Sequence, residues 1–555
     1  MTYRVGIDIG GTFTDFAMLK NGEVTLFKNL TTPDDRSVGV MNGLSRLADM
    51  EGLGLREFLS ACEAITHGTT VADNTLIEMN GAVTGLITTE GFRDEMEYRR
   101  GYKEDIWDVR LEPPKQIVPR RRRLTVPERV LNDGSVHKPL DEDAVREACR
   151  RLKKQDVQSV AVSLIFSFIN PAHEKRVAEI VAEEMPGVAL SLSHELLPRS
   201  PEYDRTSTTV VNAYVAPRVN HYLERLVTRL QDEGYANRLL VMQASGGVMT
   251  RDYIAHAPIR VLASGPAGGV IGSAHAGRAK GCNDLLCVDM GGTSYDMSLV
   301  IDGKAPAEVG WNMHHRYLVG VPMVQVETLG AGGGSICRYD GARFRVGPES
   351  AGADPGPACY RKDGPLTVTD CNLFLGRIDP AFFPSVFGPD GDQPLDPAAA
   401  RARLEDIAAG LPDSRPLEDI AEGFLAIAVD NMANAIRKIS VARGHDVTTY
   451  ALACFGGAGG QHACRVADAL GMGTVLVHPL AGILSAYGIG LAPVKAIREV
   501  SLVRPLTEDF TAELGALEAD SRAALAEQGL AADQIVLERR ARLRFSGSDS
   551  VLTLD

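Results

Sequence analysis

The sequence predicts an α/β protein of several domains, and three observations support that prediction. Apolar segments of strand length alternate with segments of helical periodicity along most of the chain, which is typical of layered α/β folds. The composition is that of an ordinary globular protein, with 45% hydrophobic and 23% charged residues. A segment near the N-terminus recurs about halfway along the 555 residues, so we expect two related lobes.

In chain order, the pattern begins with a strand and a hairpin and then alternates between helices and strands. The strands expected in the first half lie at 3–9, 14–19, 23–28, 82–88, 157–169, 187–193 and 238–244. The helices expected there lie at 37–64, 141–154, 173–185 and 203–234.

In the second half, two strand-and-turn segments flank a long helix. The expected elements are strand, Gly turn and strand over 285–300, a helix over 417–443, a strand over 450–455 and a helix over 461–470. The stretches 99–139 and 340–400 are rich in residues that interrupt regular structure, and we expect long irregular connections there.

The same alternation suggests three domains. We expect an N-terminal lobe over 1–200 and a second lobe over 201–500 that carries the phosphate and adenosine motifs. A fresh helical pattern and strand-like segments after residue 505 indicate the start of a C-terminal domain, which we place at 501–555.

Charge and cysteine usage exclude several classes of protein. The formal net charge is −14, from 58 Lys and Arg against 72 Asp and Glu, which argues against a nucleic-acid binder. Nine scattered cysteines without a C-x-x-C motif fit a reducing compartment and argue against a disulfide framework or a thiolate zinc site. No segment has the character of a signal peptide or a membrane span. We therefore expect a cytoplasmic protein with neither nucleic acid nor membrane as partner.

The repeated segment is the feature that points to chemistry. Residues 5–15 (VGIDIGGTFTD) and 286–296 (LCVDMGGTSYD) each predict an apolar strand, the motif Asp-x-Gly-Gly-Thr-x-x-Asp and a second strand. The N–H groups of a Gly-Gly turn can face phosphate oxygens, and hydroxyl groups add further donors. Two such hairpins, one from each lobe, predict a clamp for a nucleoside triphosphate. The alternative for either copy alone is a simple hairpin turn.

Asp8 and Asp289 are the candidate catalytic and metal-binding residues, because Mg²⁺ (or Mn²⁺) prefers oxygen ligands, often through water. Asp15 and Asp296 could share this role or only fix their hairpins. The candidate phosphate-binding residues of the two turns are Gly10, Gly11, Thr12, Thr14, Gly291, Gly292, Thr293 and Ser294. For the hydroxyl residues, hydrogen bonding within the turn is the alternative.

Two further Gly-rich runs, 330–335 and 455–460, are expected to pack against the sugar and base of a nucleotide. The helix expected at 461–470 would point its N-terminus at a phosphate. Neither a P-loop nor a dinucleotide fingerprint after a first strand occurs. The candidate nucleotide-binding residues in these runs are Gly332, Gly333, Gly457, Gly459 and Gly460.

Two histidines are candidate catalytic groups. His67 stands between a strand and a helix and could act as a general base, because histidine titrates near neutrality. A turn histidine with its hydrogen bonds satisfied is an equal alternative. His462, beside the second Gly-rich run, could reach phosphate or substrate. The pair His314 and His315 has no third ligand at metal spacing, which argues against a metal site.

The paired motifs and the later strand–Gly-Gly–helix turn resemble the two-lobed actin-like ATPase fold of sugar kinases and chaperone ATPases. Within that group, the sequence from residue 4 to about 500 resembles the hydantoinase A / 5-oxoprolinase family. The segments that carry this resemblance are GIDIGGTFTD (6–15), HGTT (67–70), GLITTEGFRD (85–94), 330–335, AGADPGPACY (351–360) and CFGGAGGQHAC (454–464).

The resemblance implies ATP-dependent activation of a carbonyl. A cyclic-amide hydrolase subunit would phosphorylate the carbonyl oxygen of a hydantoin, lactam or 5-oxoproline and open the ring in a hetero-oligomer with a hydantoinase B-like second subunit. An ATP-dependent ketone carboxylase subunit of the acetone or acetophenone type is the alternative, since both share these motifs. An actin-like regulatory protein that binds nucleotide, and a sugar-kinase-like enzyme, are further alternatives. We expect in-line phosphoryl transfer driven by positioning and charge stabilisation.

Overall fold

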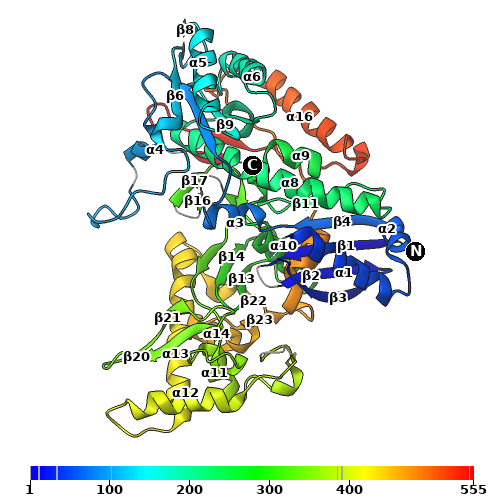
Figure 1. Cartoon of the computed structure of the whole chain (residues 1–555), viewed down its shortest axis with the longest axis vertical. Coiled ribbons are helices and arrows are strands. Elements are labelled where there is room, and N and C mark those ends of the chain that lie inside the picture. Colours follow the sequence, from blue (N-terminus) through cyan, green and yellow to red (C-terminus); the bar gives the residue numbers. More distant parts are fainter. Residues whose placement is uncertain are drawn as a thin grey trace.

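Two mixed sheets with related strand orders form the middle of the molecule, and a third, parallel sheet lies beside them (Figure 1). They belong to a computed structural model of the chain. The residues that it describes are 2–10, 13–32, 35–101, 103–308, 311–313, 316–383, 385–388, 392–548 and 551–554.

The first sheet has the order β12-β11-β4-β1-β2-β3. Its strands are β1 (Tyr3–Ile9), β2 (Phe13–Lys20), β3 (Glu23–Leu30), β4 (Cys62–Gly68), β11 (Leu240–Met242) and β12 (Val248–Thr250). Strands β1, β2 and β3 are antiparallel, and β4 runs parallel to β1 after a crossover through α1 (Arg36–Met50) and α2 (Leu55–Ala61). The expected helix over 37–64 is thus two helices and the start of a strand.

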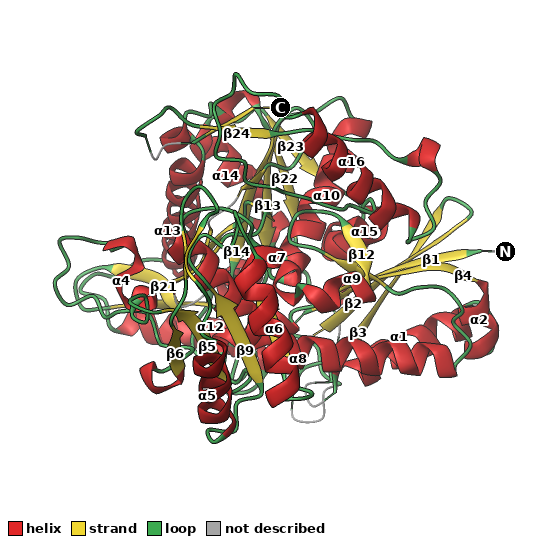
Figure 2. Ribbon diagram, turned by 90° about the horizontal axis from the view of Figure 1, so that it is seen from above, coloured by secondary structure: helices red, strands yellow, loops and turns green. Residues whose placement is uncertain are grey.

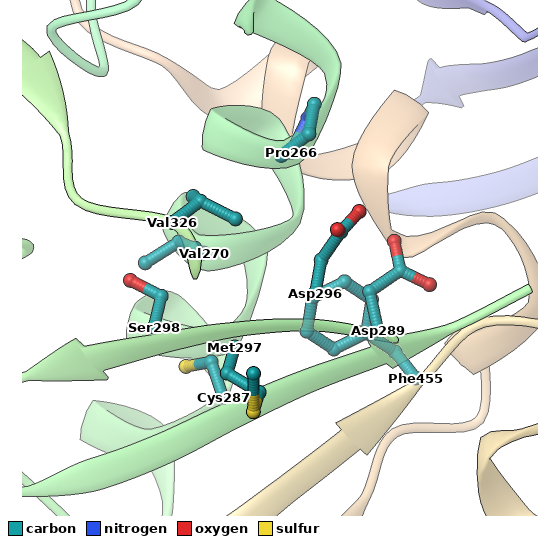
Figure 3. Close-up of a pocket in the computed structure, with 9 residues that line it drawn as sticks. All are labelled: Pro266, Val270, Cys287, Asp289, Asp296, Met297, Ser298, Val326 and Phe455. Atoms are coloured by element: carbon teal, nitrogen blue, oxygen red, sulfur yellow. The ribbon is translucent and has the colours of Figure 1, made fainter. Parts of the chain in front are cut away.

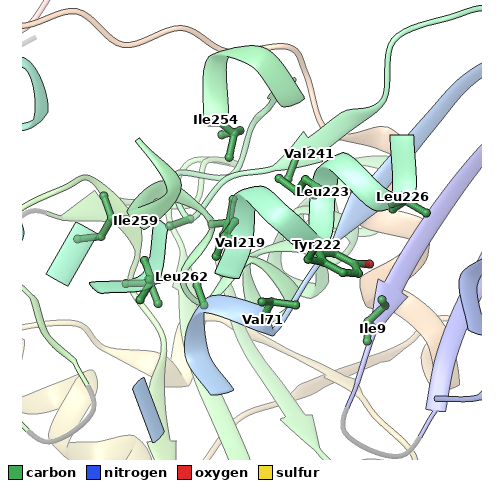
Figure 4. Close-up of a cluster of buried hydrophobic side chains, with 14 of the residues drawn as sticks. Ile9, Val71, Val219, Tyr222, Leu223, Leu226, Val241, Ile254, Ile259 and Leu262 are labelled. Carbon is green, nitrogen blue, oxygen red and sulfur yellow. The ribbon is translucent and has the colours of Figure 1, made fainter. Parts of the chain in front are cut away.

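Helices cover both faces of this sheet. Helices α1 and α8 (Glu202–Asp232) lie on one face, whereas α10 (Ser264–Ala279) and α15 (Leu484–Leu491) lie on the other (Figure 2). Apolar side chains from α8 and from α3 (Val71–Ile77) fill the space under the first face (Figure 4). Full burial of such side chains stabilises the fold by about 1.5–3 kcal/mol each.

The second sheet repeats this arrangement in the order β19-β14-β13-β22-β23. Its strands are β13 (Leu285–Met290), β14 (Tyr295–Val300), β19 (Glu327–Leu329), β22 (Ala451–Phe455) and β23 (Thr474–Val477). Again three antiparallel strands are followed by two parallel ones, with β13 in the place of β1. Helices α13 (Leu417–Ile439) and α14 (Ala463–Leu470) pack against it. The repeated topology confirms the predicted two-lobed actin-like ATPase fold.

The third sheet, β10-β9-β5-β6, is parallel throughout. Its strands are β5 (Thr84–Thr89), β6 (Arg123–Val126), β9 (Ser159–Ser163) and β10 (Ala189–Leu192), with α5 (Glu142–Lys153) and α6 (Ala172–Glu184) packed beside them. The prediction of an irregular connection over 99–139 is therefore wrong at residues 123–126, which form strand β6. Arg123 starts this strand as a buried side chain, because Val118 O and Glu97 accept its hydrogen bonds.

The prediction of a long loop over 340–400 is also wrong in part. The hairpin of β20 (Ser335–Tyr339) and β21 (Phe344–Ser350) reaches into it, and helices α11 (Val368–Phe374) and α12 (Pro397–Ala409) follow. Helix α11 begins with a capping box, in which Thr367 and Asp370 hydrogen-bond each other's backbone N–H. The sequence Thr-Val-Thr-Asp at 367–370 carried that signal.

Strands β11 and β12 join the first sheet although they follow residue 200. The first sheet thus extends across the boundary expected there, and the three-domain division stays a prediction. The last segment contains α16 (Thr511–Ala526) and a short hairpin of β24 (Ala541–Leu543) and β25 (Leu552–Leu554). Among the described residues, no helix has the length and apolar character needed to cross a membrane.

Helices α10 and α15 meet through backbone atoms. A Cβ at Gly488 would overlap the carbonyl oxygen of Gly268 and would lie 2.6 Å from Gly272 N. On its other side α15 meets β1, where a Cβ at Gly6 would overlap Ala486 O. Glycine is needed at these positions because side chains would separate the helix from both neighbours.

We expect Gly488→Ala to destabilise the fold by about 1–3 kcal/mol or more, because an overpacked contact forces backbone shifts. Thermal unfolding measures the effect. Gly515→Ala is the matched control: Gly515 also lies in a helix, but a Cβ there would meet nothing within 4 Å. The control should be stabilised by up to about 1 kcal/mol. Equal melting temperatures for Gly488→Ala and the wild type would contradict the packing described.

Candidate functional site

Asp8 and Asp289 occupy equivalent positions on the central strands of the two related sheets. Asp8 lies directly opposite Asp15 in the β1–β2 pair, and Asp289 lies directly opposite Asp296 in the β13–β14 pair. Directly opposed residues of an antiparallel pair share one face of the sheet. Each hairpin therefore presents two carboxylates side by side. In the second lobe both point toward the helical turn that carries Pro266 (Figure 3).

The surroundings of the two central carboxylates disfavour negative charge. Burial, together with the neighbouring Asp15, raises the pKa of Asp8 to about 7. Burial, together with repulsion from Asp296, Asp8 and Asp15, raises the pKa of Asp289 to about 7. The start of helix α10 lies against both hairpins, with Gly265 beside Asp8 and Pro266 lining a pocket together with Asp289 and Asp296, so the two hairpins converge on one site.

Helix α10 begins at this site. A Cβ on Gly265 would lie 3.2 Å from Asp8 Oδ1, and one on Gly68 would lie 3.1 Å from the same atom. Ser264 Oγ donates to Thr69 O at 3.2 Å, which ties the helix to the segment after β4. Sequence reasoning missed this helix start, although the small-residue run 264–269 (SGPAGG) was its signal. A small pocket beside it is lined by Pro266, Val270, Cys287, Asp289, Asp296, Met297, Ser298, Val326 and Phe455 (Figure 3).

The residues present fit a hydrated divalent cation. Asp8 Oδ1 is inaccessible to solvent and has no hydrogen-bond partner among the described residues. Among the residues that the structure describes, no three His, Cys, Asp or Glu side chains lie together in a group that could hold a metal ion. A site with two carboxylates suits Mg²⁺, which keeps several waters and takes phosphate oxygens as further ligands.

Three Gly-rich segments of the second lobe are hydrogen-bonded into one unit next to Asp289. Gly333 N and Gly334 N donate to Gly291 O and Gly292 O at 3.1 and 2.7 Å, and Ala458 N donates to Met290 O at 2.9 Å. The structure thus brings together the predicted residues of the turns at 291–294, 332–333 and 457–460. Gly292, Thr293, Gly457 and Gly460 are exposed there.

The first hairpin turn is described only in part. Gly10 N donates to Phe13 O at 2.9 Å, which closes the turn. Thr14 is buried with its hydroxyl 3.1 Å from Thr31 Oγ1, and it lies opposite Ile9, on the other face of the sheet from Asp8. The predicted residues Gly11 and Thr12 lie outside the described residues.

The structure does not bring His67 to the carboxylates. His67 pairs with Ile7 on β1, so it lies on the α8 face of the sheet, whereas Asp8 and Gly68 face α15. It is fully buried, with Nε2 2.8 Å from the hydroxyl of Tyr222 on α8. Burial lowers the pKa of His67 to about 3, which keeps the ring neutral at physiological pH.

His462 lies behind the second Gly-rich turn, where α14 begins. Its Nε2 is 3.2 Å from Nδ2 of Asn372, and the residue is buried. Burial, together with the positive charges of Arg377 and Arg465, lowers the pKa of His462 to about 4. The ring is therefore neutral at physiological pH. His314 and His315 lie outside the described residues.

The two central carboxylates should make the stability of the ligand-free protein fall as the pH rises. Their folded pKa values are about 7, against about 4 in an unfolded chain. Between these values the folded state binds more protons than the unfolded state, so raising the pH favours unfolding. We expect Asp8→Asn to unfold at a higher temperature than the wild type at pH 8, and to lose that advantage at pH 4.

Thermal unfolding in the presence of a chelator checks this expectation. Asp430→Asn is the control, because Asp430 is exposed on α13, and it should track the wild type across the range. A wild-type protein that is more stable than Asp8→Asn at pH 8 would contradict the description of the site.

Comparisons with known proteins identify the family of the chain. The family model described as hydantoinase/oxoprolinase N-terminal region matches residues 4–185, and the model described as hydantoinase/oxoprolinase matches residues 205–498.

Three relatives illustrate the similarity. Caprolactamase subunit alpha of Pseudomonas jessenii is 38% identical over 92% of this chain and 73% of its own length. The acetophenone carboxylase gamma subunit of Aromatoleum aromaticum is 35% identical over 92% of this chain and 71% of its own. The 5-oxoprolinase of Saccharomyces cerevisiae is 34% identical over 99% of this chain, which spans only 46% of that protein.

Two solved structures extend the similarity to three dimensions. The ATP-dependent caprolactamase of Pseudomonas jessenii matches 99% of this chain and 80% of its own, with a TM-score of 0.87 and 36% identity. The nucleotide-free structure of acetone carboxylase matches 100% of this chain and 81% of its own, with a TM-score of 0.80 and 27% identity. The chain therefore belongs to the hydantoinase/oxoprolinase family.

Proposed function

We propose that this chain is the ATP-binding subunit of an enzyme that opens a cyclic amide after phosphorylating its carbonyl oxygen. The observation that carries the proposal is the convergence of Asp8 and Asp289, from two related hairpins, at the start of helix α10 and beside exposed Gly-rich turns. The names of the relatives, an ATP-dependent caprolactamase and 5-oxoprolinases, support this reaction and suggest a hydantoin, lactam or 5-oxoproline as substrate.

The turns of the second lobe would bind the phosphate chain. The N–H groups of Gly292 and Thr293 lie in an exposed turn, and the start of the 16-residue helix α10 adds its dipole from the side of Asp8. Asp8 and Asp289 would hold Mg²⁺ between the lobes, with water and phosphate oxygens as its other ligands. Gly457 and Gly460 leave open space for the rest of the nucleotide.

The nucleotide supplies a phosphoryl group, which when transferred to the carbonyl oxygen makes the ring carbon open to attack by water. The transfer itself leaves ADP. Attack of water then breaks the C–N bond of the ring and releases phosphate and the ring-opened carboxylic acid, which is an amino acid when the substrate is a lactam or 5-oxoproline. The contribution of the chain is to place the phosphoryl group in line with the carbonyl and to stabilise the charge that develops. We assign no proton transfer to the two histidines: His67 faces Tyr222 on α8, and His462 is buried with its Nε2 3.2 Å from Nδ2 of Asn372.

A second subunit completes the enzyme in this proposal. The caprolactamase and acetophenone carboxylase relatives are themselves named as subunits. The yeast 5-oxoprolinase is about twice as long as the part that this chain matches. We therefore propose a hetero-oligomer in which a hydantoinase B-like chain accepts the activated ring.

A ketone carboxylase is the second candidate function. It is favoured by the 35% identity to an acetophenone carboxylase subunit and by the structural match to acetone carboxylase. The two reactions share their use of ATP and differ in their need for bicarbonate.

The experiment that separates them measures ADP release by the chain together with its second subunit, in the presence of Mg²⁺. The substrates are hydantoin, 5-oxoproline, caprolactam, acetone and acetophenone, each with and without bicarbonate. The proposal predicts turnover with a cyclic amide that is independent of bicarbonate. Turnover with only a ketone plus bicarbonate would establish the carboxylase instead.

In the same assay we expect Asp289→Asn to lower kcat by at least about 100-fold, because a carboxylate at the transferred group is removed. Asp430→Asn on the exposed face of α13 is the matched control and should keep full turnover. Undiminished turnover in Asp289→Asn would show that the chemistry takes place elsewhere.

A further inference from the structure

The two lobes present different residues opposite the second aspartate of each repeat, and these residues lie outside the repeated segments. In the first lobe, Asp15 on β2 lies directly opposite Lys28 on β3. In the second lobe, the equivalent Asp296 on β14 lies directly opposite Thr328 on β19. Strand β3 of the first lobe thus presents an ammonium group at the position where β19 of the second lobe presents a hydroxyl group.

Lys28 belongs to the carboxylate face of the first sheet. Asp8, Asp15 and Lys28 are directly opposed across β1, β2 and β3, so their side chains form one row on the same face. Lys28 Nζ lies 2.7 Å from Asp15 Oδ1 and 5.4 Å from the centre of the Phe13 ring. The lysine side chain is 42% exposed, against 19% for Asp15. Its ammonium group therefore lies at the accessible edge of the row.

The charge of Lys28 also reaches the other lobe. It lowers the pKa of Asp289 as well as that of Asp8, against the effect of burial. The corresponding residue of the second lobe, Thr328, carries no charge: its Oγ1 donates a hydrogen bond to Asp296 Oδ1 at 2.6 Å, which lowers the pKa of Asp296. The first lobe thus adds a cation to a site built from four carboxylates.

We infer that Lys28 is a phosphate-binding residue of this site, whose ammonium group bridges Asp15 and the phosphate chain of a bound nucleotide. The inference rests on the proposed function, because it assigns the nucleotide's position. A lysine suits this task because its ammonium is a compact charge on a flexible stem, which can turn from a carboxylate toward a phosphate oxygen. The arrangement makes the two lobes unequal: the first contributes a cation and the second contributes its Gly-rich turns.

The repeat itself provides the variant that tests this inference. Lys28→Thr places opposite Asp15 the residue type that lies opposite Asp296 in the second lobe. A hydroxyl donor to Asp15 is kept, and only the charge is lost. A charge-assisted contact of this kind corresponds to about a 10- to 100-fold loss of ATP affinity. Adenosine, which lacks phosphates, should bind with unchanged affinity. Lys28→Arg keeps the charge and should retain most of the affinity for ATP.

Calorimetric titration with Mg-ATP and with adenosine measures these affinities, and thermal unfolding checks that each variant is folded. Lys20→Thr is the matched control. Lys20 also forms an ion pair on this sheet, with Glu51, but it lies at the far end of the hairpin. Its loss should leave ATP binding unchanged.

A measurement on the wild-type protein avoids substitution altogether. Acetylation of lysines, followed by mass spectrometry, should show Lys28 protected by Mg-ATP but not by adenosine, while Lys20 reacts equally in all samples. Unchanged ATP affinity in Lys28→Thr, or no protection of Lys28, would overturn this inference alone. A wild-type chain that binds no ATP would overturn the proposed function together with the inference.

Discussion

The backbone contact between α10 and α15 is the constraint on which the rest of the structure depends. Gly268 and Gly272 on one helix and Gly488 on the other leave no room for side chains between them. Helix α15 also rests on β1, while α10 packs against β13. One helix pair therefore connects the central strands of both lobes, and those strands carry Asp8 and Asp289.

This arrangement has an electrostatic cost that a ligand would remove. Protein surrounds two central carboxylates and raises the pKa of both to about 7. Lys28 offsets part of the repulsion, yet Asp8 Oδ1 keeps no hydrogen-bond partner among the described residues. An unpaired buried acceptor costs stability in the free protein. A cation and a phosphate chain would provide the missing interactions, so ligand binding and lobe packing are expected to be coupled.

The sequence predicted the parts of the fold and the site that depend on local pattern. Alternating apolar residues identified the hairpins. In the structure Asp8 and Asp15 are directly opposed across the β1–β2 pair and therefore share one face of the sheet. The sequence also predicted that the Gly-rich runs 330–335 and 455–460 act together. In the structure both runs are hydrogen-bonded to residues 290–292, at the Gly-Gly turn of the second lobe. The family followed from the same motifs.

What the sequence could not predict depends on register and on distant contacts. His67 and Gly68 are neighbours in the chain, but only the pairing of β4 with β1 shows that the histidine faces α8 and the glycine faces Asp8. Gly265 and Lys28 reach the site from segments that carry no recognised motif. Strand β6 escaped prediction because a run of arginines precedes it, and Arg123 becomes buried only through its partners Val118 and Glu97.

Both hairpins are expected to bind one nucleotide. The most direct measurement is a crystal structure of the protein with Mg²⁺ and a non-hydrolysable ATP analogue. We expect the phosphate chain between the 291–294 turn and the start of α10, with the metal ion next to Asp8 and Asp289. A nucleotide bound to only one lobe, with these two carboxylates remote from its phosphates, would contradict it.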